Sequence, residues 1–202
     1  MWVFVAALVL AAPGLASAQS REPVRGVVGD VRLVSATLPS TPGWTPGLPS
    51  GALVPGRGFG VEAGGHALIG RGRHRRLGVG VSGLVLQGRA TGVDPAPTVT
   101  TRFVAAAPHG SLNFGHAQGW SYVSLGVGVA KVTSDYVGSA ADPAGWGTVF
   151  HYGGGARWFL NEHLAVSLDV RFWALTPKPE SATRPRGPAT TRVALGAGVA
   201  FR

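Results

Sequence analysis

The chain ends with the stretch TRVALGAGVAFR (191–202), in which apolar side chains alternate with small or charged ones. Successive side chains of a strand point to opposite faces, so this pattern predicts a β-strand with one bulky apolar face and one face of glycine, alanine and arginine. The stretch LAVSLDVRFWA (164–174) repeats the alternation and places Asp169 and Arg171 on the second face. Two such strands lie close together at the C-terminal end of the chain.

The same alternation recurs along the rest of the sequence. Proline cannot donate to a strand ladder, so we expect Pro108 to mark a bulge in the weakest of these segments. The further predicted strands cover about 25–36, 58–69, 77–88, 99–112, 119–130 and 146–158. The total is eight strands.

The connections between these strands alternate in length. The long ones are 37–56, 89–98, 132–145 and 175–190, and the short ones are 70–76, 113–118 and 159–163. Bacterial outer-membrane barrels have short periplasmic turns and longer outer loops, and they cross the bilayer with strands of about 9–11 residues. The sequence therefore predicts an all-β fold, an eight-stranded antiparallel up-and-down transmembrane β-barrel with both termini on the periplasmic side.

The composition suggests which face of the strands lies inside. Lipid offers no hydrogen bonds, so the sheet must close, and the interior of eight strands is only wide enough to be filled by side chains. The chain has 32 glycines among 202 residues, and they gather on the small-residue face. We therefore expect glycine, alanine and the charged residues to face a filled lumen, and leucine, valine and phenylalanine to face lipid.

Charged residues on the small-residue face form a candidate site. An unpaired buried charge is costly, so oppositely charged side chains in a narrow lumen are expected to pair. The alternative is that these side chains only fill space and fix the strand register. The predicted lumen charge network consists of Asp30, Arg32, Glu62, Arg102, Arg157, Asp169, Arg171 and Arg192.

The N-terminal residues predict an export signal. Residues 2–12 are apolar throughout, a length typical of a signal peptide and too short to span a bilayer. Ala16-Ser17-Ala18 provides small residues for cleavage before Gln19, although no Lys or Arg precedes the apolar run. We expect residues 1–18 to be removed and 19–202 to form the barrel. With no cysteine in the chain, a disulfide framework is excluded.

Two motifs resemble a known family. The stretch GGGARWFLNEHLAVSLDVR (153–171) resembles a hairpin common in small OmpA-like outer-membrane β-barrels. Gly196, Val199 and Phe201 resemble the C-terminal signal read by the barrel-assembly machinery, although Ala194 stands where the family usually has a polar residue and Arg202 follows the aromatic. The resemblance implies an outer-membrane location and assembly by that machinery. We expect the barrel to be a monomer.

Surface residues suggest partners. The net charge is +9, and Arg57, Arg89, Lys131, Arg184 and Arg186 are expected near the outer rim, where they would meet outer-membrane lipid and the phosphates of lipopolysaccharide. The loop 37–56 contains five prolines, Trp44 and no charge, so it is a candidate recognition surface. We expect a structural or surface-interaction role rather than a pore.

Other motifs do not support a catalytic or cofactor site. RGRHRR (71–76) falls in a predicted turn of an exported chain, and GVGVSG (78–83) opens no helix, so neither nucleic acid nor a dinucleotide is expected. The six histidines show no metal-ligand spacing, and no cofactor is expected.

Two alternative functions remain from the sequence. One is a lipid A-modifying outer-membrane enzyme, for which His151 with Ser124 or Ser167 is the candidate pair. Glu62 and His66 lie about 13 Å apart along one strand, too far for a direct pair. Because these groups point inward, we predict that the protein is not an enzyme. The other alternative is a soluble periplasmic lipocalin-like ligand-binding barrel, which would have an apolar interior and a polar exterior.

Overall fold

A computed structural model describes residues 26–41, 43–45, 47–48, 51–70, 75–92, 97–116, 118–136, 145–180 and 185–202, except the side chain of His116. The predicted export signal lies outside these residues. The strands are β1 (Val27–Thr37), β2 (Arg57–Ile69), β3 (Arg75–Thr91), β4 (Thr98–His116), β5 (Gly119–Tyr136), β6 (Gly147–Phe159), β7 (Leu164–Leu175) and β8 (Thr190–Phe201).

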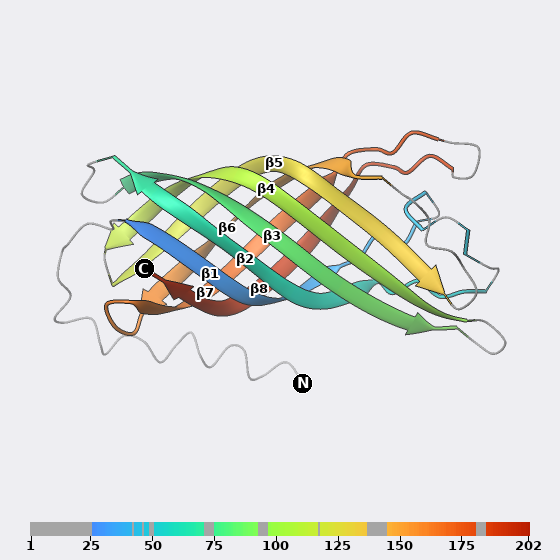
Figure 1. Ribbon diagram of the computed structural model, residues 1–202, viewed down its shortest axis with the longest axis horizontal. Helices are drawn as coiled ribbons and strands as arrows, with labels where there is room; N and C mark the ends of the chain where they lie inside the picture. Colours follow the sequence, from blue (N-terminus) through green and yellow to red (C-terminus); the bar gives the residue numbers. More distant parts are fainter. Residues whose placement is uncertain are drawn as a thin grey trace.

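The eight strands form one closed barrel in chain order (Figure 1). Every strand pairs antiparallel with the next, and β8 pairs antiparallel with β1. The predicted up-and-down barrel is therefore confirmed. In the part of the chain that the structure describes, no helix is long and apolar enough to cross a membrane.

The register shows how far the strands tilt. A row of paired residues leaves β5 at Ser121 and returns to β5 at Lys131, an offset of ten residues. The row runs through Ala156, Leu168, Ala197, Leu33, Val61, Val85 and Val104. With about 3.3 Å per residue and 4.8 Å between strands, this offset corresponds to a tilt of about 40°. Each step to the next strand along this row therefore climbs by about 1.25 residues toward the long-loop end.

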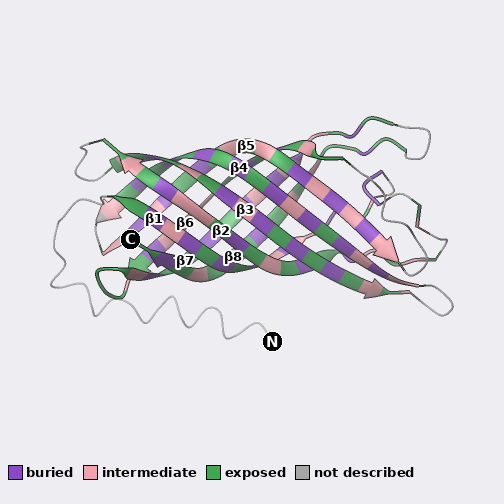
Figure 2. Cartoon of the chain, viewed as in Figure 1, coloured by how far each residue is buried: buried purple, intermediate pink, exposed green. Residues whose placement is uncertain are grey.

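The two faces of the wall have opposite chemistry. Bulky apolar side chains point outward, and Leu33 and Leu125 are 74% and 71% exposed, whereas Asp30 and Arg171 on the inner face are almost fully buried. Figure 2 shows the resulting alternation of buried and exposed residues along each strand. The predicted orientation is confirmed, and the lipocalin-like alternative is wrong because such a barrel needs a polar exterior.

Glycine on the inner face lets neighbouring strands and side chains come close together. A Cβ atom on Gly198 would overlap the carbonyl oxygen of Val31, and one on Gly60 would overlap that of Val85. The narrow lumen therefore depends on glycine at these positions, as the composition suggested.

The expected bulge at Pro108 is wrong. The pairs Ala106–Val129 and His109–Gly126 lie on either side of Pro108 and keep the same register between β4 and β5. Pairing with β5 lapses at Ala107 and Pro108 and then resumes. The missing donor of proline is thus accommodated by a local break in the ladder, with no extra residue.

Candidate functional site

The middle of the lumen holds a layer of paired charges. Three carboxylates and three arginines, all buried, come from four strands: β1 supplies Asp30 and Arg32, β2 Glu62, β6 Arg157, and β7 Asp169 and Arg171. Their side chains reach the same layer because they occupy inward positions on neighbouring parts of the wall. We call these six residues the charge layer.

Asp30 lies at the centre of one half of the charge layer. Arg157 donates through Nε and Nη2 to the two carboxylate oxygens of Asp30, at 2.9 and 2.6 Å. Arg32 Nη2 lies 2.7 Å from Oδ1 of Asp30, and Ser167 donates to the same oxygen at 3.3 Å. The fork of Arg157 thus grips the carboxylate with two parallel bonds, which fixes geometry as well as charge.

Glu62 joins this half to the other. Its Oε1 atom lies 3.2 Å from Arg32 Nη1 and 2.7 Å from Arg171 Nη1. Arg171 Nη2 lies 3.2 Å from Asp169 Oδ2, and Tyr122 donates its hydroxyl proton to the same carboxylate oxygen. Every carboxylate of the charge layer therefore has an arginine partner.

Two histidines extend the polar layer. Arginine can only donate, so Arg157 Nη2 donates to His66 Nε2 at 2.6 Å. This assignment leaves the His66 proton on Nδ1, from which it donates to His109 Nε2 at 3.1 Å. The ring of His109 in turn meets that of His151 edge-on, with centroids 5.5 Å apart.

The structure brings six of the eight predicted network residues together. Arg192 lies apart from the charge layer near the long-loop end, where it donates to the carbonyl oxygen of Leu38 at 3.0 Å and to Thr190.

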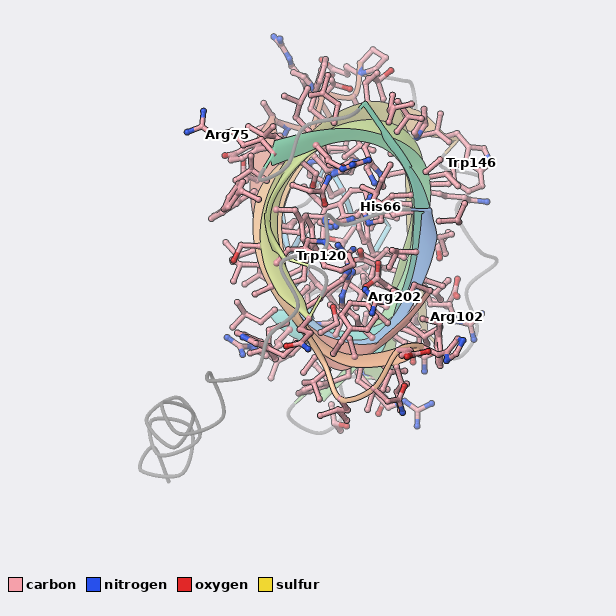
Figure 3. All side chains as sticks on the ribbon, turned by 90° about the vertical axis from the view of Figure 1, so that its left-hand side faces the viewer. His66, Arg75, Arg102, Trp120, Trp146 and Arg202 are labelled. Atoms are coloured by element: carbon pink, nitrogen blue, oxygen red, sulfur yellow. The ribbon has the colours of Figure 1, made fainter. Side chains whose placement is uncertain are left out.

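The assignment of Arg102 to the lumen is wrong. Arg102 is exposed on the outer wall and donates to Gln87 at 3.2 Å, and Figure 3 shows it outside the barrel while His66 and Trp120 lie within it. On β4 the odd-numbered residues face inward, as buried Thr101 and Phe103 show. Both faces of β4 mix apolar and polar residues here, so the sequence does not reveal the phase.

The predicted network omitted its hydrogen-bonding neighbours. Arg32 donates to Ser167 and to the hydroxyl of Tyr122, each at 2.9 Å, and Arg171 donates to Ser82 at 3.0 Å. The alternation places all three residues on the same face as the charges. That shared face is a signal which a search restricted to charged residues misses.

Apolar clusters lie on both sides of the charge layer. Toward the short turns, Val28, Trp120, Ala165 and Ala200 form a small buried cluster. Toward the long loops, the larger cluster fills the lumen with bulky side chains. Its bulky members include Leu38, Trp44, Leu84, Leu86, Phe103, Val132, Trp173 and Leu175.

Part of the first long loop packs at the outer end of the lumen. Trp44 is 3% exposed, and its indole nitrogen donates to the carbonyl oxygen of Pro188 at 2.9 Å. Lys178 Nζ lies 5.2 Å from the centre of the Trp44 ring. This loop therefore uses its tryptophan to pack against the β7–β8 connection, so recognition by the loop, which stays a prediction, would have to use its other residues.

The outer wall has polar limits at a membrane-like spacing. On β5 the outward side chains between Ser121 and Lys131 are Val123, Leu125, Val127 and Val129. Ten residues at about 3.3 Å each and a tilt of about 40° span about 25 Å, the height of the apolar band in outer-membrane barrels. Aromatic side chains occur near both limits, as membrane interfaces favour. They include Phe114, Trp158 and Phe201 near the short-turn end and Trp146 near the long-loop end.

Four cations share one level at the outer limit of this band. Lys131 pairs across the ladder with Val104, and Arg102 pairs with Thr133, two residues further along β5. When the climb of about 1.25 residues per strand is allowed for, Arg57, Arg89 and Arg102 fall within about two residues of the level of Lys131. We call Arg57, Arg89, Arg102 and Lys131 the cation belt. It covers β2 to β5, and an outward acid, Asp135, lies farther out on β5.

The remaining predicted positions have defined places. Gly196 lies on the inner face of β8, and Val199 and Phe201 lie on the outer face. Their recognition by the assembly machinery stays a prediction. Arg186 lies in the β7–β8 connection, and Arg184 lies outside the described residues, as do the first four residues of the 71–76 motif.

The polar groups considered for catalysis lie inside the barrel. His151, Ser124 and Ser167 are buried in the lumen, and so is His66. Within the described ranges no three His, Asp or Glu side chains are grouped to hold a metal ion.

Comparison with solved structures shows that this chain is similar to known proteins in fold. Neisserial surface protein A (NspA) aligns with a TM-score of 0.57 and 12% identity over 89% of this chain and 99% of that one. Ail, the attachment invasion locus protein of Yersinia pestis, in complex with the heparin analogue sucrose octasulfate, aligns with a TM-score of 0.53 and 12% identity over 88% and 100% of the two chains. No protein-family model and no curated protein matches the sequence.

The fold is that of the small outer-membrane barrels. The resemblance to OmpA-like barrels, inferred from two motifs, is thereby confirmed in architecture. The exposed apolar band about 25 Å high gives the physical reason, because only lipid can cover it without cost. The protein is a barrel of the outer membrane.

Proposed function

We propose that the protein is a non-conducting outer-membrane barrel with a structural or surface-interaction role, held in the outer leaflet by the phosphates of lipopolysaccharide. The proposal that the barrel does not conduct ions rests on the order of side chains along the lumen, in which apolar clusters lie on both sides of the charge layer. Ions entering from either end would have to pass an apolar cluster before they reach the charge layer. Moving an ion through such a cluster removes its water and costs several kcal/mol.

A conductance measurement tests the closed lumen. Purified barrel inserted into a planar lipid bilayer is expected to give no discrete current steps, because side chains fill the interior. A porin with 16 strands, which leaves an aqueous channel, is the positive control. Regular current steps that scale with the number of inserted molecules would contradict the proposal.

The cation belt supports the lipid partner. Four cationic side chains at the level where the apolar band ends would lie among headgroups, and arginine pairs with phosphate through two parallel hydrogen bonds. The exposed position of Arg102 adds a fourth cation to the three that the sequence predicted at this level of the wall. This charge complements the phosphates of lipopolysaccharide in the outer leaflet.

A charge-neutral variant tests the belt. Changing Arg57, Arg89, Arg102 and Lys131 together to glutamine should reduce the lipopolysaccharide that co-purifies with the folded barrel, and the remainder should be less sensitive to salt. Arg75→Gln, at the opposite end of the outer wall, is the control and should retain the wild-type amount. Equal co-purification from all three proteins would contradict the role of the belt.

A further inference from the structure

A shallow apolar groove crosses the outer wall from β6 to β2. Gly154, Ala156 and Ala197 contribute small outward positions to it. Leu168 and Leu33 line it on the strands between. Because the groove lies in the apolar band, whatever fills it must be hydrocarbon.

The strand register gives the groove a direction in the membrane. Its residues follow the rows that climb around the barrel, so its β6 end lies deeper in the membrane than its β2 end. Four strand spacings of about 4.8 Å give a length of about 19 Å, and the tilt makes the vertical rise about 12 Å. Ala156 lies one row step above Ser121, near the inner limit of the apolar band, and Ala197 lies two steps higher, near its middle. One leaflet of the hydrocarbon core is about 15 Å thick, so a chain that enters the groove at its β2 end runs obliquely through the outer leaflet as far as Ala197.

The upper end of the groove lies beside the cation belt. Phe59 and Ser35 line this end, and Arg57, two residues before Phe59 on β2, points its Nη1 atom toward Ser35 Oγ at 3.5 Å. An apolar channel that ends at an arginine complements a molecule with a hydrocarbon tail and an anionic head. At the β6–β7 end, the stacked rings of Tyr152 and Phe172, with centroids 5.1 Å apart, occupy the next outward positions above Gly154 and Val170.

We propose that this groove is a binding site for one acyl chain of a phosphorylated glycolipid of the outer leaflet, with a headgroup phosphate on Arg57. This inference rests on the proposed lipopolysaccharide contact and adds a defined binding site for one of its acyl chains. Other lipids of the outer wall only solvate the barrel, whereas this one is held by its shape and by its charge. The small side chain of Ala197 is what leaves room for it.

Filling the groove tests the proposal. Ala197→Phe places a ring in the channel, and Ala106→Phe places the same ring at another exposed outward alanine, on β4, away from the groove. Purified folded proteins in detergent are titrated with bisphosphorylated lipid A, and bound lipid is counted by native mass spectrometry. We expect Ala197→Phe to weaken the tightest binding event roughly tenfold and Ala106→Phe to leave it unchanged. Retarded or advanced migration of unboiled samples on a gel confirms that each variant is folded.

The outcomes separate the groove from the belt. Equal binding by Ala197→Phe, Ala106→Phe and wild type would overturn the groove, even if the charge-neutral belt variant bound less lipid A and so supported the belt. Titration with phosphatidylglycerol distinguishes the occupant: binding as tight as that of lipid A, and equally weakened by Ala197→Phe, would overturn the assignment to a phosphorylated glycolipid. If the belt variant and Ala197→Phe each bind lipid A less tightly than wild type, the result supports both the cation belt and the groove.

Discussion

The charge layer and the larger apolar cluster fill neighbouring parts of one lumen by different means. In the charge layer, each carboxylate is held by arginines at defined distances, so the side chains have little freedom to rearrange. In the apolar cluster, Phe103 and Trp173 meet edge-on with ring centroids 6.3 Å apart, and the contact is one of shape and volume. Removing one partner from the charge layer should therefore lower the free energy of unfolding strongly, because a buried charge is left unpaired. In the apolar cluster the loss should instead scale with the side-chain volume removed.

Removing an acid from the charge layer should have the largest effect. Asp30→Ala leaves Arg157 and Arg32 buried without this carboxylate, and we expect the free energy of unfolding to fall by about 3–5 kcal/mol. Urea unfolding in detergent micelles measures it. Asp135→Ala, on the outward face of β5, is the control and should change stability by about 0.5 kcal/mol or less. Similar losses in the two variants would remove the distinction between the charge layer and the outer wall.

A charge on the outer wall should cost somewhat less, and the cost should depend on depth. Val127 points outward within the apolar band, so Val127→Arg should destabilise the barrel by about 2–4 kcal/mol in a bilayer. Thr133→Arg, on the same face of β5 but beyond Lys131, should cost about 0–1 kcal/mol. Unfolding measured in vesicles checks both. A Val127→Arg protein that stays folded in water without detergent would mean that this wall does not face lipid.

Shortening a valine should cost more stability in the apolar cluster of the lumen than on the outer wall. Val132 is fully buried in the lumen, and Val132→Ala removes two methylene equivalents, worth about 1.6 kcal/mol. Val129→Ala, on the outward face of the same strand, should cost less, because lipid fills the space that the side chain leaves. Urea titration of the pair in the same micelles gives the difference. A larger loss at Val129 would reverse the assignment of the two faces.

The smallest effect on stability is expected at the cation belt. Arg57 is exposed and donates only to Ser35 among its hydrogen bonds in the described structure, so Arg57→Gln should change the free energy of unfolding by less than about 0.5 kcal/mol. Its effect should instead appear as weaker lipopolysaccharide binding in a titration at low salt. A large loss of stability would make Arg57 a structural residue rather than a lipid contact.

The alternation was sufficient to predict the barrel, because lipid outside and a crowded lumen inside impose opposite demands on successive residues. Asp30, Arg32 and Glu62 could be placed inside for this reason. Beyond the membrane, the two faces of a strand no longer need opposite chemistry, so the alternation does not show where the strand ends. We expected β5 to end near residue 130, and it continues to Tyr136. The same loss of contrast near the outer end of β4 explains the error at Arg102.

The apolar cluster shows a second limit of sequence reasoning. Leu86 and Phe103 are bulky yet lie inside: Leu86 is paired with Gly60 on β2, and Phe103 meets Trp173 of β7, a contact that only the closed barrel brings about. The burial of Trp44 likewise depends on contact with Pro188, which lies 144 residues away in the chain. Long-range complementarity of this kind has no local pattern in the sequence.

The central claim is that the bulky face of each strand meets hydrocarbon, and single cysteines on β5 test it most directly. The chain has no cysteine, so a spin label at one introduced site reports only that site. In vesicles, a label at Leu125→Cys should collide readily with oxygen dissolved in lipid, and one at Ser124→Cys should be shielded from it. The reverse result, with the label at residue 124 in lipid and that at 125 enclosed, would contradict the account.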